Sequence, residues 1–586
     1  MRAASFIFSY TFTLNYVDSS SYTKKEPTRT YNRTKMRPML LFVLEKRKDS
    51  IYALETVNDK KIELKTVEVI CMKKKLMISM IAVMIFIFSV PVSTYACTAV
   101  YVGKEVSEDG TVIIARTGDG HPLYNPVKLE RCISEDTAGK VYRQVTNNFS
   151  WKLPDRTYDY VCAPQWECNS STDGRYAAYA LNEKGLNLTA AVTAYVCDAA
   201  KEADPYATDG IAEEGITDIL GASCKTAREA VKLAAKICDE KGSNESNILL
   251  FNDRKEAWYM EIYTGHQYAA VKMPTDKVAV FCNEFMLEYL EDYDEVITSP
   301  NLLTLPEEAG FAEYDSDGRL NLFNTYAGKG RLADYANMRT WYGHFVFSPS
   351  TAGKYYTKKK YPLFFEPDEK VAVTDVMKLF RSRFEDTEYY ADINDDGSRR
   401  VIGTETQQMA HVIQTFTDLP NDRCSIAWTS VSQAECAPFL PVFGCMNQFD
   451  PAFTKDNADY VIDDEAAYSV FKELNTLCIT DRATYKTAVS EYWTELENHL
   501  VKTAANAMKT ASKLSPDSAY RYLTKFGMKE EKAAFENAKI MADEVLLDMA
   551  QHSDTFKLQF DYSTLKYSKP TERKPFELSL KNYPFR

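Results

Sequence analysis

The chain has 586 residues, of which 45% are hydrophobic, and this length and composition suffice for a large core in about two to four domains. Residues 1–96 hold 16 basic and 8 acidic residues, so the remainder holds 54 and 75 and has a net charge of −21. Because nucleic-acid binding needs a basic surface, this balance excludes a nucleic-acid partner.

The N-terminal region contains the pattern of a signal peptide. Residues 1–71 are rich in Ser, Thr and Lys and show no sustained hydrophobic periodicity. A basic segment at 72–75, an apolar run at 76–92 and the small residue Ala96 follow in the order typical of export signals. We therefore expect residues 72–96 to be a signal peptide, with translation beginning at Met72. Residues 1–71 are then a gene-model artefact or a disordered extension.

A membrane anchor is the alternative interpretation of the apolar run. Ser79, Ser89 and Pro91 interrupt it, and a membrane span needs roughly 20 predominantly apolar residues. The sequence therefore predicts a secreted or cell-envelope protein that contacts the membrane only transiently, through its signal peptide.

Cleavage after Ala96 would make Cys97 the first residue of the mature protein. Such a residue carries a nucleophilic thiol and a free α-amine, whose ordinary pKa of about 7.7–8.0 lets it accept and return a proton near neutral pH. An N-terminal threonine is activated by its own amine in the same way. Cys97 is therefore the candidate nucleophile, with its own amine as the base.

The segment that follows predicts a β-hairpin around this cysteine. Two runs rich in β-branched and aromatic residues, 97–103 and 111–119, flank a polar segment that contains Asp-Gly. A turn near residues 105–107 would place Cys97 roughly opposite Arg116, with Arg116 and Asp119 beside the new N-terminus. An ordinary surface hairpin with an ion pair is the other interpretation of this segment alone.

This segment resembles the cysteine dipeptidases among the N-terminal-nucleophile hydrolases, which are relatives of penicillin V acylases and bile salt hydrolases. The family pattern begins with Cys-Thr, passes through Val-Gly and Asp-Gly, and closes with Ile-Ala-Arg and an Asp three residues after the Arg. Cys97, Arg116 and Asp119 match that spacing. Between Arg116 and Asp119, this chain has Thr117-Gly118 where the family usually has Asn-Glu. The resemblance implies an α+β fold, a four-layer αββα sandwich, and hydrolysis without a cofactor.

Scaffold elements can be assigned farther along the chain. Thr226 to Glu229 form a capping box that begins an amphipathic helix ending near Gly242. Residues 247–251 and 257–263 have the composition of strands.

A second resemblance to the dipeptidases follows these strands. The family has Trp-x-x-Glu, then Gly-His and an aromatic-x-Ala-Val strand, and these places are taken by Trp258, Glu261, Gly265 and His266. A single histidine is more often structural than catalytic. The resemblance therefore makes His266 at most a substrate-binding residue that lines the pocket.

Two further residues match positions of the family's active site. Asn283 ends the apolar strand at 278–282, and in related hydrolases an Asn at such a strand end donates its side-chain amide to the oxyanion. Arg339 lies in the segment Tyr-Ala-Asn-Met-Arg-Thr-Trp, which resembles the family's Arg-x-Trp segment. The resemblance implies that Arg116, Asp119 and Arg339 orient nucleophile and substrate. Each residue alone is also compatible with a structural role.

The last part of the chain is predicted to be helical. Residues 406–443 still resemble the dipeptidases, which gives a catalytic domain at 97–463 and a helical C-terminal extension at 464–586. Ser515-Pro516 is a helix start with Pro at the first position. An apolar stripe on the following helix consists of Phe535, Ala538, Met541, Val545, Leu546 and Met549.

The cysteines indicate neither a metal site nor a disulfide framework. Cys71 and Cys97 aside, eleven of the thirteen remain, an odd number that leaves at least one thiol unpaired in an exported protein. Cys162 and Cys168 are close enough in sequence to pair, but they lack the spacing and the second pair of a zinc site. We therefore expect no metal.

The sequence favours an exported cysteine-type dipeptidase that acts on short peptides through a thioester at Cys97, with a small peptide as its partner. An acylase of the penicillin or bile-salt type, on the same fold, is the first alternative. A lipid-anchored binding protein attached through Cys97 is the second, although Thr94 stands where lipoproteins favour Leu. Homo-oligomer formation stays open.

Overall fold

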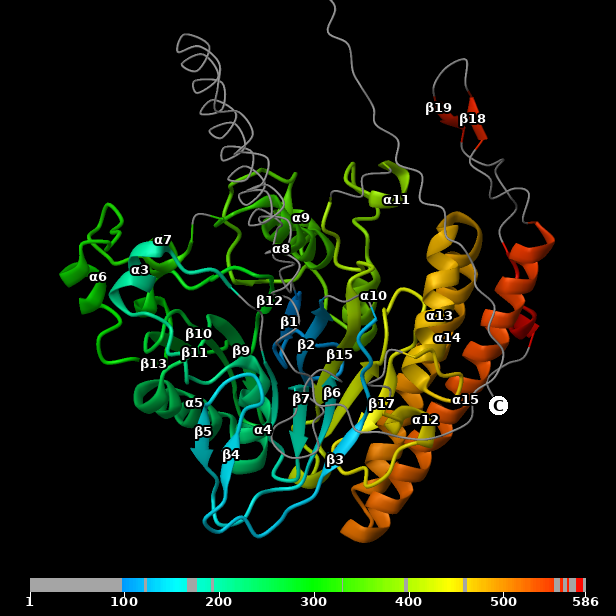
Figure 1. The fold of residues 1–586 in the computed structure, drawn as a ribbon, viewed down its shortest axis with the longest axis horizontal. Coiled ribbons are helices and arrows are strands. Elements are labelled where there is room, and N and C mark those ends of the chain that lie inside the picture. The colour runs from blue at the N-terminus through cyan, green and yellow to red at the C-terminus, as the bar shows by residue number, and fades with distance from the viewer. Residues whose placement is uncertain are drawn as a thin grey trace, which may run out of the picture. The chain divides into compact units, whose positions relative to one another are not determined.

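The computed structural model describes residues 97–120, 124–165, 176–190, 194–328, 330–394, 399–456, 461–552, 559–561, 566–568 and 576–582. The predicted signal peptide, the segment before it and Cys168 lie outside these ranges. Within them, no helix combines the length and the apolar character needed to cross a membrane. The fold mixes helices with antiparallel sheets (Figure 1).

A seven-stranded antiparallel sheet carries the N-terminal hairpin at its centre. Its spatial order is β14 (Phe364–Phe365), β12 (Val278–Phe281), β1 (Ala99–Val102), β2 (Val112–Asp119), β15 (Gln407–Thr415), β16 (Ser425–Ser430) and β17 (Leu440–Phe443). All eight residues of β2 are buried, including its charged ones. Such burial follows from its central place, because β2 contacts strands of a second sheet and also helix α10 (Val373–Arg381).

An eight-stranded antiparallel sheet faces the first one. Its order is β13 (Val296–Thr298), β11 (Tyr268–Lys272), β10 (Ala257–Ile262), β9 (Asn247–Asn252), β8 (Asn187–Ala190), β7 (Tyr176–Asn182), β6 (Tyr160–Gln165) and β3 (Glu130–Cys132). Contacts of β2 with β8 and β9 join the two sheets. Two small hairpins complete the strands, β4 (Val141–Arg143) with β5 (Ser150–Lys152) and β18 (Gln559–Asp561) with β19 (Lys566–Ser568).

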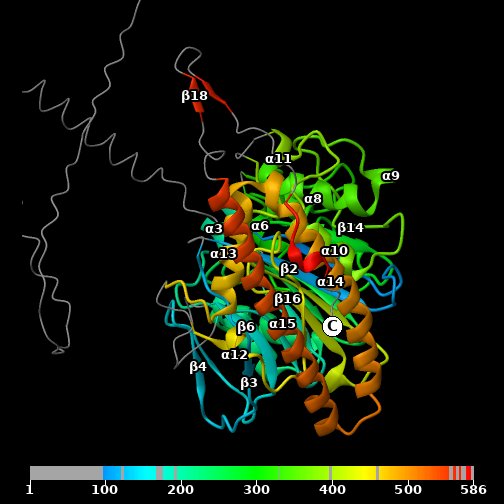
Figure 2. The same cartoon turned by 90° about the vertical axis from the view of Figure 1, so that its right-hand side faces the viewer.

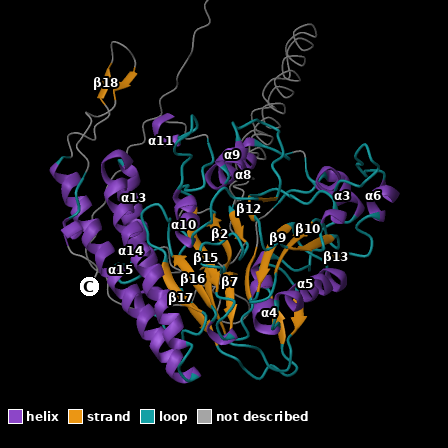
Figure 3. Ribbon diagram, turned by 180° about the vertical axis from the view of Figure 1, so that it is seen from behind, coloured by secondary structure: helices purple, strands orange, loops and turns teal. Residues whose placement is uncertain are grey.

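Helices cover both sheets. Helices α4 (Glu213–Ser223) and α5 (Ala227–Lys241) pack on the eight-stranded sheet, whereas α8 (Asp334–Phe347) and α10 pack on the seven-stranded one. Figure 3 shows the strands between α4 and α5 on one side and the long C-terminal helices on the other. The shorter helices are α3 (Asp198–Ala203), α6 (Thr304–Ala309), α7 (Leu322–Tyr326), α9 (Pro349–Ala352), α11 (Ala391–Asn394) and α12 (Pro451–Thr454). Single 3-10 turns are Leu290–Asp292, Asn421–Arg423 and Ser579–Asn582.

The predicted start and end of α5 are confirmed. The Thr226 hydroxyl accepts the backbone N–H of Glu229, and Gly242 follows the last residue with a φ of 75°. That left-handed region suits glycine, and a Cβ there would lie 2.6 Å from the Cβ of Ala207. The strands predicted at 247–251, 257–263 and 278–282 are also present, as β9, β10 and β12.

Three C-terminal helices pack together and against the end of the seven-stranded sheet. They are α13 (Ala467–Thr480), α14 (Arg482–Ala511) and α15 (Pro516–Gln551), which lie side by side in Figure 2. Helices α14 and α15 both contact β17. The predicted start of α15 at Ser515-Pro516 is confirmed. In the predicted apolar stripe, Ala538, Met541 and Val545 are buried, but Leu546 is half exposed.

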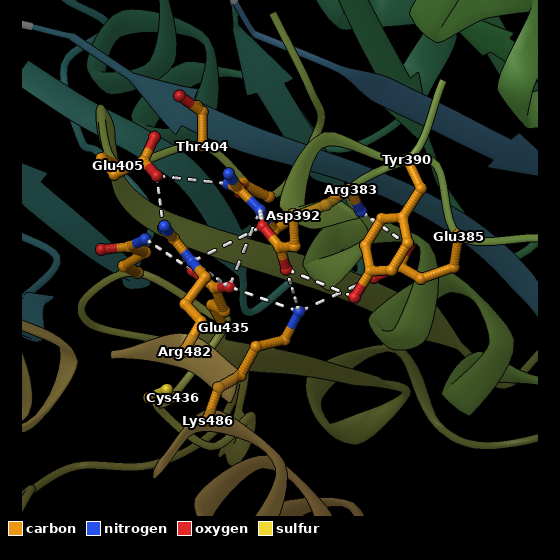
Figure 4. Close-up of polar contacts among 12 residues, drawn as sticks. Arg383, Glu385, Tyr390, Asp392, Thr404, Glu405, Glu435, Cys436, Arg482 and Lys486 are labelled. Atoms are coloured by element: carbon orange, nitrogen blue, oxygen red, sulfur yellow. Dashed lines mark hydrogen bonds and ion pairs between the residues drawn. The ribbon is translucent and has the colours of Figure 1, made fainter. Parts of the chain in front are cut away.

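A network of buried charges ties α14 to the sheet region (Figure 4). The Glu435 carboxylate, whose side chain is fully buried, accepts from the Arg482 Nε at 2.9 Å and lies 3.5 Å from the Lys486 Nζ. Asp392 contacts Lys486 at 3.2 Å and the Arg383 Nε at 2.6 Å. Because each buried ion has a partner of opposite charge, the network can hold these segments together without a lone buried ion.

Candidate active site

The predicted N-terminal hairpin is present and holds Cys97 at its edge. Ala99 pairs with Arg116, so Cys97 lies two residues beyond the partner of Arg116 rather than opposite it. Two hydrogen bonds extend the pairing, from the Thr98 N–H to the Thr117 hydroxyl at 3.0 Å and from the Thr117 N–H to the Thr98 carbonyl at 2.9 Å. The Cys97 side chain is buried, and the nearby backbone N–H of Asp119 acts to lower the pKa of its thiol.

Arg116 and Asp119 leave β2 in opposite directions, because residues three apart on a strand point to opposite faces. The Arg116 Nη1 donates to the Glu213 Oε1 at 3.0 Å, and Glu213 is the first residue of α4. Asp119 accepts from the Arg400 Nη2 at 3.1 Å through Oδ2. Its other oxygen, Oδ1, is buried and has no hydrogen-bond partner among the described residues. Both predicted residues therefore flank Cys97.

Arg339 connects the nucleophile's backbone to α8. Its fully buried guanidinium donates through Nη1 to the Cys97 carbonyl at 2.9 Å and to the Thr98 hydroxyl at 3.1 Å. Nε donates to the carbonyl of Tyr335, one helical turn earlier, at 2.8 Å. The guanidinium thus fixes the position of the Cys97 peptide group.

Asn283 is brought to the same place by strand pairing. β12 pairs with β1 so that Phe281 lies opposite Ala99, and continuing that register brings Asn283 level with Cys97. The Arg339 Nη2 donates to the Asn283 Oδ1 at 3.0 Å. Because Oδ1 is the acceptor of this bond, the amide nitrogen of Asn283 is the donor end of the side chain.

Burial governs the protonation states of the cluster. Burial raises the pKa of the Cys97 thiol to about 11, against the opposing influence of Arg116. Burial also raises the pKa of the Asp119 carboxyl, although Arg400 and Arg339 oppose the shift. In the uncleaved chain, where the nitrogen of Cys97 is an amide, the thiol is therefore protonated at neutral pH.

His266 lies apart from this cluster in the described contacts. It occupies the turn between β10 and β11, its side chain is half exposed, and its Nδ1 lies 2.8 Å from the Asp204 Oδ1. Its backbone N–H donates to the same carboxylate at 2.6 Å. No described contact joins His266 to Cys97, Arg116 or Asn283.

Two residues of the cluster were not predicted from the sequence, namely Glu213 and Arg400. Each reaches the site from a segment far from Cys97, and neither belongs to a recognisable motif. The only local signal for Glu213 is an acidic pair, Glu213-Glu214, at the start of a helix, which is usually a solvated helix end. Within the described ranges, no group of three or more His, Cys, Asp and Glu residues is arranged to hold a metal ion.

Known proteins resemble this chain over most of its length. Residues 96–495 match the model of peptidase family C69. A probable dipeptidase B from Streptococcus pyogenes serotype M1 is 30% identical over 471 residues, 77% of this chain and 93% of that protein. A probable dipeptidase from Salmonella dublin is 29% identical over 367 residues, 61% of this chain and 83% of that protein.

A solved structure, a mutant of conjugated bile acid hydrolase from Clostridium perfringens, aligns with a TM-score of 0.18 and 16% identity. That alignment covers 38% of this chain and 63% of the hydrolase. The family match begins one residue before Cys97 and covers well over half of the chain, which confirms the family predicted from the Cys97 motif. The chain belongs to peptidase family C69 and is a peptidase.

Proposed function

We propose that the chain is a dipeptidase whose nucleophile is the Cys97 thiol, activated by the α-amine that cleavage between Ala96 and Cys97 exposes. The observation that carries this proposal is the convergence of Arg116, Asp119 and Arg339 on one buried cysteine at the start of the family match. The names of the two relatives above, a probable dipeptidase B and a probable dipeptidase, support a dipeptide as the substrate.

The cluster suits the chemistry of an N-terminal nucleophile. The α-amine takes the proton of the Cys97 thiol while sulfur attacks the peptide carbonyl carbon, forming a C–S bond and an oxyanion. The amide nitrogen of Asn283 donates to that oxyanion, a type of donor worth roughly 10²–10³ in rate. The C–N bond then breaks, and the amine returns the proton to the leaving group.

A water molecule completes the cycle. It attacks the thioester with the α-amine as the base, the C–S bond breaks, and the acid product leaves with the thiol restored. Asp119 suits the α-amine, because its Oδ1 is buried without a hydrogen-bond partner among the described residues and an ammonium group beside it would supply one. No step needs a metal or a cofactor.

Export by the signal peptide at 72–96 is part of the same proposal, since signal peptidase would expose Cys97. We also propose that the two facing sheets and their helices form the four-layer αββα arrangement of N-terminal-nucleophile hydrolases. Two observations support this assignment. Strand β1, which Cys97 precedes, pairs with β2, and helices pack on both sheets.

The test compares two cysteine variants of the mature enzyme on a panel of dipeptides and N-acyl amides. Cys97→Ser should lose nearly all hydrolysis of dipeptides. Cys282→Ser is the matched control, because the Cys282 sulfur is also buried and lies 3.6 Å from the Thr98 hydroxyl, yet has no role in the mechanism. Full activity of Cys97→Ser would overturn the proposal, and preference for the N-acyl amides would make the enzyme an acylase instead.

A further inference from the structure

The ion pair between Arg116 and Glu213 joins the central β-strand of one sheet to a helix on the other. The Arg116 Nη1 and the Glu213 Oε1 are 3.0 Å apart, and the two residues are 2% and 7% exposed. An arginine buried beside a nucleophile needs a partner, because a lone buried charge costs several kcal/mol. The motif around Cys97 supplies the arginine, and α4 supplies the counter-charge.

The start of α4 is held firmly, so Glu213 is a fixed partner. The Glu213 N–H donates to the Glu245 Oε1 at 2.8 Å, and the Ala212 N–H donates to the Gln144 Oε1 at 2.9 Å. The next residue, Glu214, turns away and accepts the Val145 N–H at 2.6 Å. Two adjacent buried acids therefore differ in role: Glu214 binds backbone amides, and Glu213 binds the arginine beside the nucleophile.

Several charged or titratable groups surround this pair. Glu245 and the Tyr176 hydroxyl face Glu213, and Cys97 faces Arg116. His411 of β15 pairs with Arg116 in the sheet, and burial, followed by Arg116, holds the pKa of its imidazole well below the usual value. His411 is therefore neutral and adds no charge beside Arg116, whereas Glu213 is an acid that an ion pair joins to Arg116.

The charge of Glu213 also acts on the nucleophile. It raises the pKa of the Cys97 thiol, in opposition to Arg116. Burial raises the pKa of Glu213 itself to about 7, an effect that Arg116 opposes and Glu245 reinforces. The arginine and the glutamate thus act as one unit on the thiol.

We propose that Glu213 is a positioning residue for the reaction at Cys97: its carboxylate holds the Arg116 guanidinium in place and offsets the positive charge that it presents to the thiol. This inference rests on the proposed function. It predicts two separate effects of Glu213, one on the position of the Arg116 guanidinium and one on the charge beside the Cys97 thiol. Two variants of Glu213 can distinguish them.

The experiment measures pH profiles of kcat/KM for Glu213→Gln, Glu213→Asp and the matched control Glu214→Gln, each in the mature enzyme. Above about pH 7, where the Glu213 carboxyl is ionised, Glu213→Gln leaves Arg116 unbalanced, which favours the deprotonated nucleophile, so the acidic limb should move to lower pH by about half a unit or more. Glu213→Asp keeps the charge but shortens the reach, so kcat should fall about tenfold with the limb unmoved. Glu214→Gln should change only stability.

The outcomes are distinct. Unchanged limbs and unchanged kcat/KM in both Glu213 variants would make Glu213 purely structural and overturn the proposal. If Glu213→Gln does not fold, Glu213→Asp decides: a tenfold lower kcat per folded molecule supports positioning, and a normal kcat contradicts it. Cys97→Ser is measured alongside, because full activity there would refute the proposed function whatever the Glu213 variants show.

Discussion

The Arg339 guanidinium donates a hydrogen bond of 2.9 Å to the backbone carbonyl of Cys97, 242 residues earlier in the chain. The same group donates to the Asn283 side chain at 3.0 Å. One buried side chain therefore sets the distance between the nucleophile and the proposed oxyanion donor. This makes Arg339 a positioning residue for both groups.

Replacing Arg339 should reduce activity and stability together. In Arg339→Met the Cys97 carbonyl and the Asn283 amide oxygen lose their donor, and each buried group left unsatisfied costs about 1–3 kcal/mol. Loss of the Cys97 position should lower kcat by roughly 10²-fold. Urea unfolding and steady-state kinetics on the folded fraction measure the two effects. A stable variant with normal kcat would contradict the assigned role.

Exposure of the α-amine should change the reactivity of Cys97. In a chain that retains Ala96, burial keeps the pKa of the thiol at about 11, so alkylation by iodoacetamide at pH 8 should be slow and rise about tenfold per pH unit. In a chain that begins at Cys97, the adjacent ammonium lowers the thiol pKa, and labelling at pH 8 should be faster. Peptide mass spectrometry reads both rates, with Cys282 as the internal control. Equal rates at Cys97 would argue against activation by the amine.

The buried charge network of Figure 4 should contribute to stability. Glu435→Gln removes the anion between Arg482 and Lys486, and breaking a buried ion pair from one side costs about 3–5 kcal/mol. The control is Glu135→Gln, whose pair with Lys140 is exposed and should change stability by about 0.5 kcal/mol or less. Urea unfolding at constant pH compares them. Similar small losses in both variants would show that the network is not stabilising.

Glu531 should make the protein less stable at alkaline pH. Its carboxyl is buried on α15 and accepts the Asp450 N–H at 2.6 Å, and burial raises its pKa to about 8. The unfolded chain, with a pKa near 4.3, loses this proton first, so stability is intact below about pH 4 and falls as pH rises toward 8. Glu531→Gln should therefore be more stable than the natural protein at pH 8, by at least about 1.4 kcal/mol, and equal to it near pH 4. Thermal unfolding at the two pH values measures this; an advantage that is equal at both would contradict the assignment.

Local sequence signals predicted the elements better than the contacts between them. The capping box at Thr226 and the Ser515-Pro516 pair predicted two helix starts correctly, because a few adjacent residues determine where a helix begins. The prediction that Leu546 belongs to the apolar stripe of α15 was wrong for the buried face, because the sequence pattern was wider than the face that the helix buries.

The hairpin register shows where local reasoning stops. The predicted turn put Cys97 roughly opposite Arg116, whereas Ala99 is the residue that pairs with Arg116. The connection from Gly103 to Thr111 also forms a bridge between Ser107 and the distant Val371, which the local sequence could not predict. Glu213 escaped prediction for the same reason, since it lies 97 residues from its partner. Only the fold brings such residues together, and sequence patterns describe neighbours along the chain.

The most direct test of this account is the N-terminal sequence and intact mass of the active protein recovered from a host that exports it. We predict a chain that begins at Cys97, with a free α-amine and an unmodified thiol, and with activity that appears only in this form. A fully active protein that still carries Ala96, or one whose Cys97 bears a diacylglycerol group and an acylated amine, would contradict the mechanism.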